Sequence, residues 1–98
     1  MKVSFKLTPK AKEDIWEIWN YTVIKWGEPK ADEYTKKIYK RCQWLADNQN
    51  IGISRDEIKP GYRSYPEGKH IIFYRIVDNE IQIIGVPHQS EDINNMFD

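Results

Sequence analysis

Two apolar runs divided by a short polar segment constrain the fold of this chain more than any other feature. The runs are HIIFYRIV at residues 70–77 and IQIIGV at residues 81–86, with Asp78-Asn79-Glu80 between them. Asp and Asn tolerate the left-handed backbone conformations that a tight reversal needs. The sequence therefore predicts an antiparallel hairpin. Residues 70–77 are apolar on both faces, which is typical of a central strand covered on each side.

Shorter alternating patterns predict two further strands. Gly61 to Tyr65 alternates aromatic with polar residues and is joined to the hairpin by Pro66-Glu67-Gly68, a turn tripeptide. Together these segments predict a three-stranded antiparallel meander. Near the start of the chain, Val3, Phe5 and Leu7 alternate with lysine and serine. That period of two predicts a half-buried strand, which we place at an edge of the sheet.

Two helical segments lie between the first strand and the meander. Thr8-Pro9 is a strong helix start, and the helix runs to about Trp26, where Gly27 stops it. Glu28-Pro29 begins a second helix that frays near residues 48–50, and the short connection makes the pair an antiparallel helical hairpin. Weak periodicity at residues 51–59 predicts a loop. Residues 90–97 can form a short helix with Ser90 as its cap.

The order of these elements predicts one α+β domain covering residues 1–98. In it an N-terminal strand and an antiparallel helical hairpin combine with a mainly antiparallel sheet, and the meander and short helix lie at the C-terminal end. The helical hairpin packs on one face of the sheet. A chain of 98 residues is long enough for one hydrophobic core without disulfides or metals.

Composition removes several classes of function. The chain has 15 basic and 15 acidic residues, so its formal charge is zero, which disfavours a general nucleic-acid binder. Cys42 is the single cysteine, and its place in an apolar helical stripe predicts an inert buried thiol. The two histidines have no third ligand nearby, so we expect no metal and no cofactor. With no signal region or membrane-length apolar segment in the sequence, we expect a cytoplasmic protein.

Candidate binding residues gather in the meander. Arg63, Tyr65, Tyr74 and Arg75 are predicted to form an aromatic and guanidinium patch on the sheet face that the helices leave uncovered, because such groups are enriched at interfaces. The alternative is a set of ordinary cross-strand pairs on a solvated face. His88, at the end of the last strand, is either a functional group or a structural one that caps the short helix or bonds a carbonyl.

Large apolar side chains outside the predicted core indicate a second contact surface. Trp19 and Trp26 fit the core stripe of the first helix, whereas Trp16 and Trp44 lie beside the stripes of their helices. Exposed patches of this kind usually bind a partner, although a wider helix stripe would also explain them. His70, beside a turn, is expected to bond locally or to face solvent. The packing face predicted for the short C-terminal helix consists of Ile93, Met96 and Phe97.

Several of these segments together resemble a known family. They are the opening Leu7-Thr8-Pro9 with Ala11, Asp14, Ile15 and Ile18, the Gly61-Tyr62-Arg63 start of the meander, the strand from His70 to Arg75, and the closing residues 83–92, IIGVPHQSED. In order and spacing they are similar to the ParE toxins of the ParE/RelE superfamily, which are also described as plasmid stabilisation proteins. The resemblance covers nearly the whole chain.

The resemblance implies a toxin of a type II toxin–antitoxin system that inhibits DNA gyrase by binding, with no catalysis of its own. Its partners would be gyrase and a small ParD-like antitoxin, without sequence-specific nucleic-acid binding and without a membrane. On this view the target contacts come from Arg63, Tyr65, His70, Tyr74, Arg75 and His88. The antitoxin contacts come from Trp16, Trp44, Ile93, Met96 and Phe97.

The RelE branch of the same superfamily provides the main alternative, since its members cleave mRNA on the ribosome. That reaction needs basic groups and a proton carrier around the scissile phosphate. Here the segment after the last strand is Gln89-Ser90-Glu91-Asp92, which is acidic where a cleaving relative would be basic. Arg63, Arg75 and His88 remain as groups from which a nuclease site could assemble. A non-toxic protein that keeps only the fold is the third reading.

Overall fold

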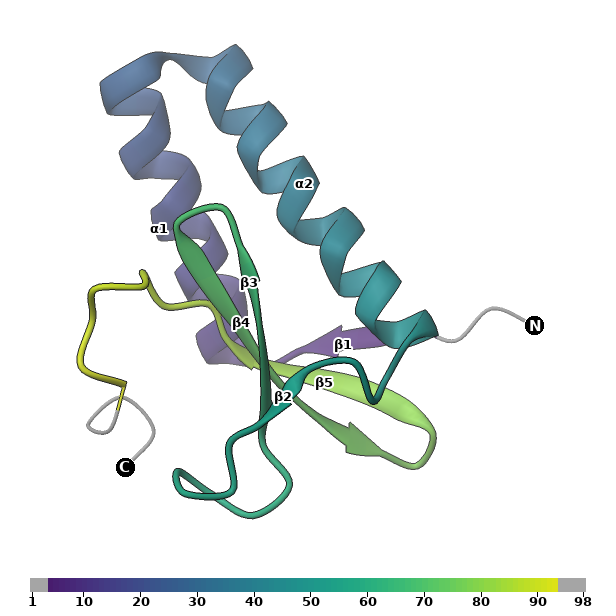
Figure 1. The fold of residues 1–98 in the computed structure, drawn as a ribbon. Helices are drawn as coiled ribbons and strands as arrows, with labels where there is room; N and C mark the ends of the chain where they lie inside the picture. The colour runs from purple at the N-terminus through teal and green to yellow at the C-terminus, as the bar shows by residue number, and fades with distance from the viewer. Residues whose placement is uncertain (1–3, 94–98) are drawn as a thin grey trace.

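The computed structural model describes residues 4–93 and contains one five-stranded mixed sheet with two helices. The elements in chain order are β1 (Phe5–Leu7), α1 (Pro9–Trp26), α2 (Glu28–Asp47), β2 (Ile53–Ser54), β3 (Arg63–Glu67), β4 (His70–Val77) and β5 (Glu80–Gly85). The sheet order is β1-β5-β4-β3-β2. β1 pairs with β5 in parallel, and the other pairs are antiparallel. The α+β architecture, the edge position of β1 and the central position of β4 are therefore confirmed (Figure 1).

The helical hairpin begins and ends where its capping residues predict. The Thr8 backbone is extended (φ −70°, ψ 162°), and its Oγ1 accepts a hydrogen bond from the backbone N–H of Ala11. Gly27 has φ 92°, in the region that favours glycine, and its N–H donates to the carbonyl of Val23 at 2.8 Å. Pro29 stands in the first turn of α2. One glycine thus ends α1 and starts α2.

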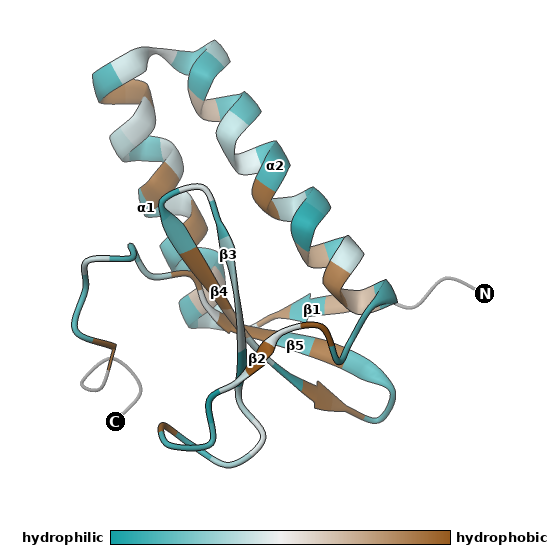
Figure 2. Cartoon of the chain, in the orientation of Figure 1, coloured by the Kyte–Doolittle hydropathy of each residue, from teal (hydrophilic) through white to brown (hydrophobic). Residues whose placement is uncertain are grey.

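The main core lies between the helical hairpin and one face of the sheet. Helix residues of this core include Ala11, Ile15, Ile38 and Leu45, and the sheet residues are Ile72, Tyr74, Ile81 and Ile83. The helices are mainly polar with isolated apolar bands, whereas apolar colour runs through the middle of β4 and β5 (Figure 2). Each fully buried aliphatic side chain contributes about 1.5–3 kcal/mol relative to an exposed one. Cys42 is fully buried here, and burial raises the pKa of its thiol to about 12, so it is inert as predicted.

A smaller apolar cluster covers the opposite face of the central strands. Phe73 and Ile84 are buried there, and Ile58, Tyr62, Ile71 and Ile93 pack against them. The loop before β3 and the segment after β5 therefore shield the face that the helices leave open. This arrangement explains why β4 is apolar on both faces along most of its length.

Turn residues explain two features of the meander. Asp78 and Asn79 have φ of 50° and 65°, which is the backbone expected for a two-residue hairpin loop. The predicted turn at Pro66-Glu67-Gly68 was placed too early, because β3 continues to Glu67 and the reversal uses Gly68, with φ 59°. Pro66 is tolerated in the strand because β2 pairs only with Arg63 and Ser64, so no β2 partner requires its missing N–H.

Two further boundaries differ from prediction. Residues 51–59 contain the two-residue edge strand β2, which is too short to give a periodic signal. Ser90 lies in a turn rather than at a helix start, and its backbone N–H donates to Nδ1 of His88. Ile93 is the first helical residue after this turn, and the remaining residues of the predicted short helix, 94–97 with Met96 and Phe97, lie outside the described residues.

Candidate partner-binding site

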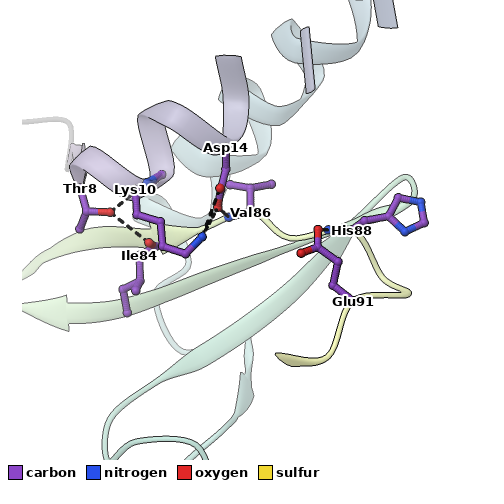
Figure 3. A network of polar contacts seen from close by, with 8 residues as sticks. Thr8, Lys10, Asp14, Ile84, Val86, His88 and Glu91 are labelled. Atoms are coloured by element: carbon purple, nitrogen blue, oxygen red, sulfur yellow. Dashed lines mark hydrogen bonds and ion pairs between the residues drawn. The ribbon is translucent and has the colours of Figure 1, made fainter. Parts of the chain in front are cut away.

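Polar contacts fix the first turns of α1 to the end of β5. Thr8 Oγ1 donates to the carbonyl oxygen of Ile84 at 3.0 Å while accepting from Ala11. Asp14 Oδ2 accepts from the backbone N–H of Val86 at 2.9 Å, and Lys10 Nζ lies 3.2 Å from Asp14 Oδ1. Figure 3 shows these groups converging where the chain leaves β5, with His88 and Glu91 farther along the same segment. The contacts therefore set the position of the segment that carries His88.

The two histidines, far apart in sequence, are neighbours in the structure. His70 and His88 form an isolated antiparallel bridge, flanked by hydrogen bonds from Ile71 N to Pro87 O and from Gln89 N to Lys69 O. Their ring centroids are 5.2 Å apart with an interplanar angle of 86°. β4 and the segment after β5 thus place both imidazoles at one end of the sheet.

Each histidine also has its own hydrogen-bond partner. Tyr34 Oη from α2 lies 2.6 Å from His70 Nδ1 and accepts from the backbone N–H of Lys69 at 3.2 Å. His88 Nδ1 lies 2.7 Å from Ser90 Oγ. The expectation that His70 bonds only locally or faces solvent was wrong, because its partner lies 36 residues earlier in the chain. Pairing of β4 with the segment after β5 brings His70 beneath α2.

Burial fixes the protonation of the Tyr34–His70 pair. Burial and the neighbouring His88 lower the pKa of His70 to about 4. Burial also raises the pKa of Tyr34, so its hydroxyl keeps its proton and can donate to the neutral Nδ1 of His70. A general base needs a pKa near the operating pH, and His70 does not meet that condition. The Tyr34–His70 hydrogen bond therefore joins α2 to the start of β4.

Two adjoining cavities open around the histidines. Their volumes are about 290 and 490 Å³, and both are lined by Tyr21, His70 and His88. Asp14, Glu17 and Glu91 line the smaller cavity. Lysines from both helices and from the turn between β3 and β4 line the larger one: Lys25, Lys30, Lys37 and Lys69. The site is a groove with an acidic end and a basic end.

Comparison with known proteins identifies the family. The sequence model of the ParE toxin of type II toxin–antitoxin systems, parDE, matches residues 5–93. Toxin ParE1 of Mycobacterium tuberculosis is 35% identical over 95 residues, which is 96% of this chain and 97% of that protein. The chain belongs to the ParE toxin family.

Solved structures agree with the sequence match. In a structure of the chromosomal ParDE system of Pseudomonas aeruginosa, the matching chain has a TM-score of 0.75 and 27% identity, with 89% of this chain and 96% of that chain covered. The YoeB dimer of Staphylococcus aureus, at 21% identity, has a TM-score of 0.61 with 90% and 98% covered, and shares the fold. The predicted family and ParE/RelE fold are confirmed, and the chain is a toxin of a type II toxin–antitoxin system.

The predicted patch of four meander residues does not exist as one surface in this ParE family member. Tyr74 is fully buried, and its Oη donates to Gln49 O and accepts from Gly52 N. Arg63 stands opposite Tyr74 in register, so it lies on the same, helix-covered side. Arg75 follows Tyr74 in the strand and therefore points to the other face. The prediction was wrong because it grouped consecutive residues of β4 that alternate between faces.

Arg63 and Tyr65 have structural contacts of their own. Arg63 Nη1 donates to the carbonyls of Gly52 at 2.8 Å and Asn50 at 3.3 Å, so it holds the loop before β2. Tyr65 packs on Trp44, with ring centroids 5.2 Å apart, and the guanidinium of Arg41 lies 4.7 Å from the centroid of the Trp44 ring. These contacts make Trp44 and Tyr65 part of the packing between α2 and β3.

The other predicted contact residues divide between exposed and covered positions. Trp16 is exposed, as expected for a partner contact. Ile93 packs on the Phe73 and Ile84 cluster, and Met96 and Phe97 lie outside the described residues. Trp26, predicted in the core, is 66% exposed, because the last turn of α1 extends beyond the sheet (Figure 1).

Sequence reasoning missed most of the groove. Asp14, Glu17, Ile18, Tyr21, Thr22 and Lys25 recur along α1 at the spacing of one helical face, but most are polar and do not show in an apolar periodicity. Among residues 4–93, no cluster of three or more possible metal ligands and no helix suited to crossing a membrane is present.

Proposed function

We propose that this ParE family toxin inhibits DNA gyrase by binding it in the cytoplasm, and that a ParD-like antitoxin neutralises it. The observation that carries the proposal is the separation of the groups that RNA cleavage would require. Arg63 and Arg75 lie on opposite sides of the sheet, and His88 stands at the far end of β4, beside His70. Because the two arginines of the nuclease alternative lie apart from each other and from His88, they favour binding over catalysis.

Arg75 and the two histidines lie towards opposite ends of β4. His70 and Arg75 are five residues apart in β4, or roughly 17 Å at about 3.3 Å per residue. Groups that stabilise a phosphoryl transition state must lie within about 3 Å of the reacting atoms, and Arg63 and Arg75 on opposite faces of the sheet do not meet one phosphate in this conformation. The exposed Glu91, whose Oε1 accepts from the backbone N–H of His88, adds negative charge beside the imidazole.

Similarity supports the ParD-like partner. The Pseudomonas aeruginosa structure that this chain resembles over 89% of its length comes from a ParDE system. On that basis we expect an antitoxin of the ParD type encoded beside this toxin. Among the predicted target contacts, Arg75 is the exposed arginine, and it projects from the sheet face opposite the helices with Gln82 Oε1 2.8 Å from its Nε. We propose Arg75 as a gyrase contact.

A pair of in vitro assays tests the function. Purified toxin is expected to inhibit DNA supercoiling by gyrase and to leave ribosome-bound mRNA intact, and equimolar antitoxin is expected to restore supercoiling. Arg75→Ala should raise the inhibitory concentration about tenfold, as loss of an interface arginine does, while Lys12→Ala, an exposed change on α1, should not. Uninhibited gyrase together with cleaved message would reject the proposal in favour of the endoribonuclease alternative.

A further inference from the structure

Four basic side chains stand within six consecutive residues in the middle of α2. We call this set the α2 basic face: Lys36, Lys37, Lys40 and Arg41. Its three lysines are exposed and its arginine is half-buried, and α2 forms one side of the molecule (Figure 1). Acidic side chains gather elsewhere, around the smaller cavity beside α1. A chain without net charge therefore presents a local positive surface.

The exposed lysines of this face differ in their ionic contacts. Lys37 Nζ lies 3.6 Å from Glu33 Oε1. Among residues 4–93, Lys36 and Lys40 form no ion pair. Because these two lysines are four residues apart, they lie on the same side of the helix, with a rise of about 6 Å between them. Their ammonium groups are thus available to an anionic partner.

A separate hollow at this face holds the guanidinium of Arg41. Its volume is about 490 Å³, and its lining consists of Lys37, Lys40, Arg41, Trp44 and Glu67. Arg41 Nε donates to Glu67 Oε1 at 2.9 Å, and the guanidinium carbon lies 4.7 Å from the centroid of the Trp44 ring. Since a guanidinium has five N–H donors, this carboxylate contact leaves most of them for other acceptors. An arginine whose orientation is already fixed loses little entropy on binding, and its planar fork suits a phosphate.

The density of anions in duplex DNA suits this surface better than that of an acidic peptide. A duplex carries one phosphate charge per about 1.7 Å of its axis, so the roughly 6 Å between Lys36 and Lys40 corresponds to about three or four phosphates. An extended peptide rises about 3.3 Å per residue and alternates its side chains, so it presents about one carboxylate over the same distance. Several neighbouring cations can therefore bind phosphates at once, but not carboxylates of one strand.

The aromatic ring in the hollow favours duplex over single-stranded nucleic acid. Sites for single strands bind unpaired bases by stacking them on accessible aromatic rings. Trp44 is only partly exposed, and it already packs against Tyr65 and Arg41. The hollow thus provides cations for phosphates without offering its indole ring for base stacking.

We infer that the α2 basic face binds the phosphate backbone of duplex DNA without reading its sequence. The role of this contact rests on the proposed function, because gyrase acts on duplex DNA and a toxin bound to gyrase meets that DNA. Two of the four cations already face carboxylates, so the contact is weak, with a Kd of about 10⁻⁴–10⁻⁶ M, as phosphate contacts alone provide. It adds to the binding of gyrase and does not replace it.

Fluorescence anisotropy of a short labelled DNA duplex tests the site with toxin alone. The logarithm of the wild-type affinity should fall with the logarithm of the salt concentration, with a slope of about −2 to −4. Lys36→Gln with Lys40→Gln should weaken binding at least about tenfold at low salt and reduce the slope by about 2, one for each lost phosphate contact.

The matched control is Lys6→Gln with Lys59→Gln, which removes the same charge at exposed positions away from α2. Charges far from the contact are screened, so this pair should change the affinity less than about threefold. Thermal melts followed by circular dichroism show whether each variant is folded.

Several results would overturn the inference. Wild-type toxin would fail to bind the duplex at low salt, or the α2 pair would bind it as well as the control pair. Tighter binding of oligothymidine than of the duplex would identify a single-strand site, and displacement of the duplex by polyglutamate at equal charge concentration would identify a site for acidic polypeptides. Toxin that binds DNA through α2 but leaves supercoiling uninhibited would instead reject the proposed function, and the DNA site would stand.

Discussion

The two ends of α1 have opposite roles in this ParE family toxin. At its N-terminal end, Thr8 and Asp14 bond the backbone of Ile84 and Val86, 76 and 72 residues away in sequence. At its C-terminal end, Trp26 is exposed and lysines surround a cavity of about 490 Å³. The difference shows how a small domain can fix one end of a helix in its fold and leave the other end exposed.

The largest effect is expected at the fixed end. Asp14→Ala removes the acceptor for the backbone N–H of Val86 and the partner of Lys10. A backbone donor left without a partner, together with a lost charge-assisted bond, should lower the free energy of unfolding by about 2–3 kcal/mol. Urea denaturation followed by circular dichroism measures the change.

Glu13→Ala provides the control for that measurement. Glu13 is the exposed residue one position before Asp14, so its truncation should change stability by less than about 0.5 kcal/mol. Equal losses in the two variants would show that the N-terminal end is not fixed by the Val86 contact, and the comparison between the two ends would lose its basis.

The two ends of α1 also show which features of the structure could be predicted from the sequence. Thr8 and Gly27 act through bonds to residues three or four positions away, and Pro9 acts through its fixed φ, so the helix boundaries were predictable from local patterns. The contacts of Thr8 with Ile84 and of Asp14 with Val86 depend on how α1 meets β5, which no local pattern encodes. The groove was missed for the same reason, since two helices, a turn and the segment after β5 contribute to it.

The error over the meander patch has a different physical cause. Alternation along β4 places Tyr74 on the helix side and Arg75 on the other, and a register shift between Phe73 and Tyr74 changes the pairing with β5. A sequence pattern gives the period of a strand, but it does not say which face the helices cover when both faces are apolar. Tyr74 resembled a surface aromatic and proved to be a core residue whose hydroxyl bonds a loop.

An intermediate effect is expected at the middle of the groove, where His70 contacts Tyr34. The folded-state pKa of His70 is about 4, below its ordinary value of 6.5. The unfolded chain therefore takes up the proton first, and stability falls as the pH decreases from about 6.5 to about 4. Because the ring is only partly buried, we expect a loss of about 1–2 kcal/mol after solvent screening.

The variant His70→Asn isolates this contribution, because its amide oxygen can accept from Tyr34 and does not titrate. Free energies of unfolding are measured for wild-type and variant protein at several values between pH 4 and pH 7.5. The difference between them should shrink or reverse towards pH 4. If the free energies of unfolding of wild type and variant change in parallel with pH, His70 has the same pKa in the folded and unfolded states. That result would mean that the hydrogen bond from Tyr34 to the neutral Nδ1 of His70 does not form.

The smallest effect on stability is expected at the free end. Trp26→Ala removes a ring that is 66% exposed, so the free energy of unfolding should change by less than about 0.5 kcal/mol. Trp44→Ala is the matched truncation at a packed position, where loss of the contacts with Tyr65 and Arg41 should cost about 1–3 kcal/mol. Thermal and urea denaturation of both variants provides the comparison.

For antitoxin affinity we expect the opposite ranking of the two variants, with Trp26→Ala losing more than Trp44→Ala. Trp26→Ala is expected to weaken binding about tenfold, because the ring borders the basic end of the groove, whereas folded Trp44→Ala should bind within about threefold of wild type. A Trp26 variant with full affinity would mean that the apolar part of the antitoxin docks elsewhere. A Trp26 variant that unfolds as readily as the Trp44 variant would mean that the end of α1 belongs to the fold, and the contrast between its two ends would disappear.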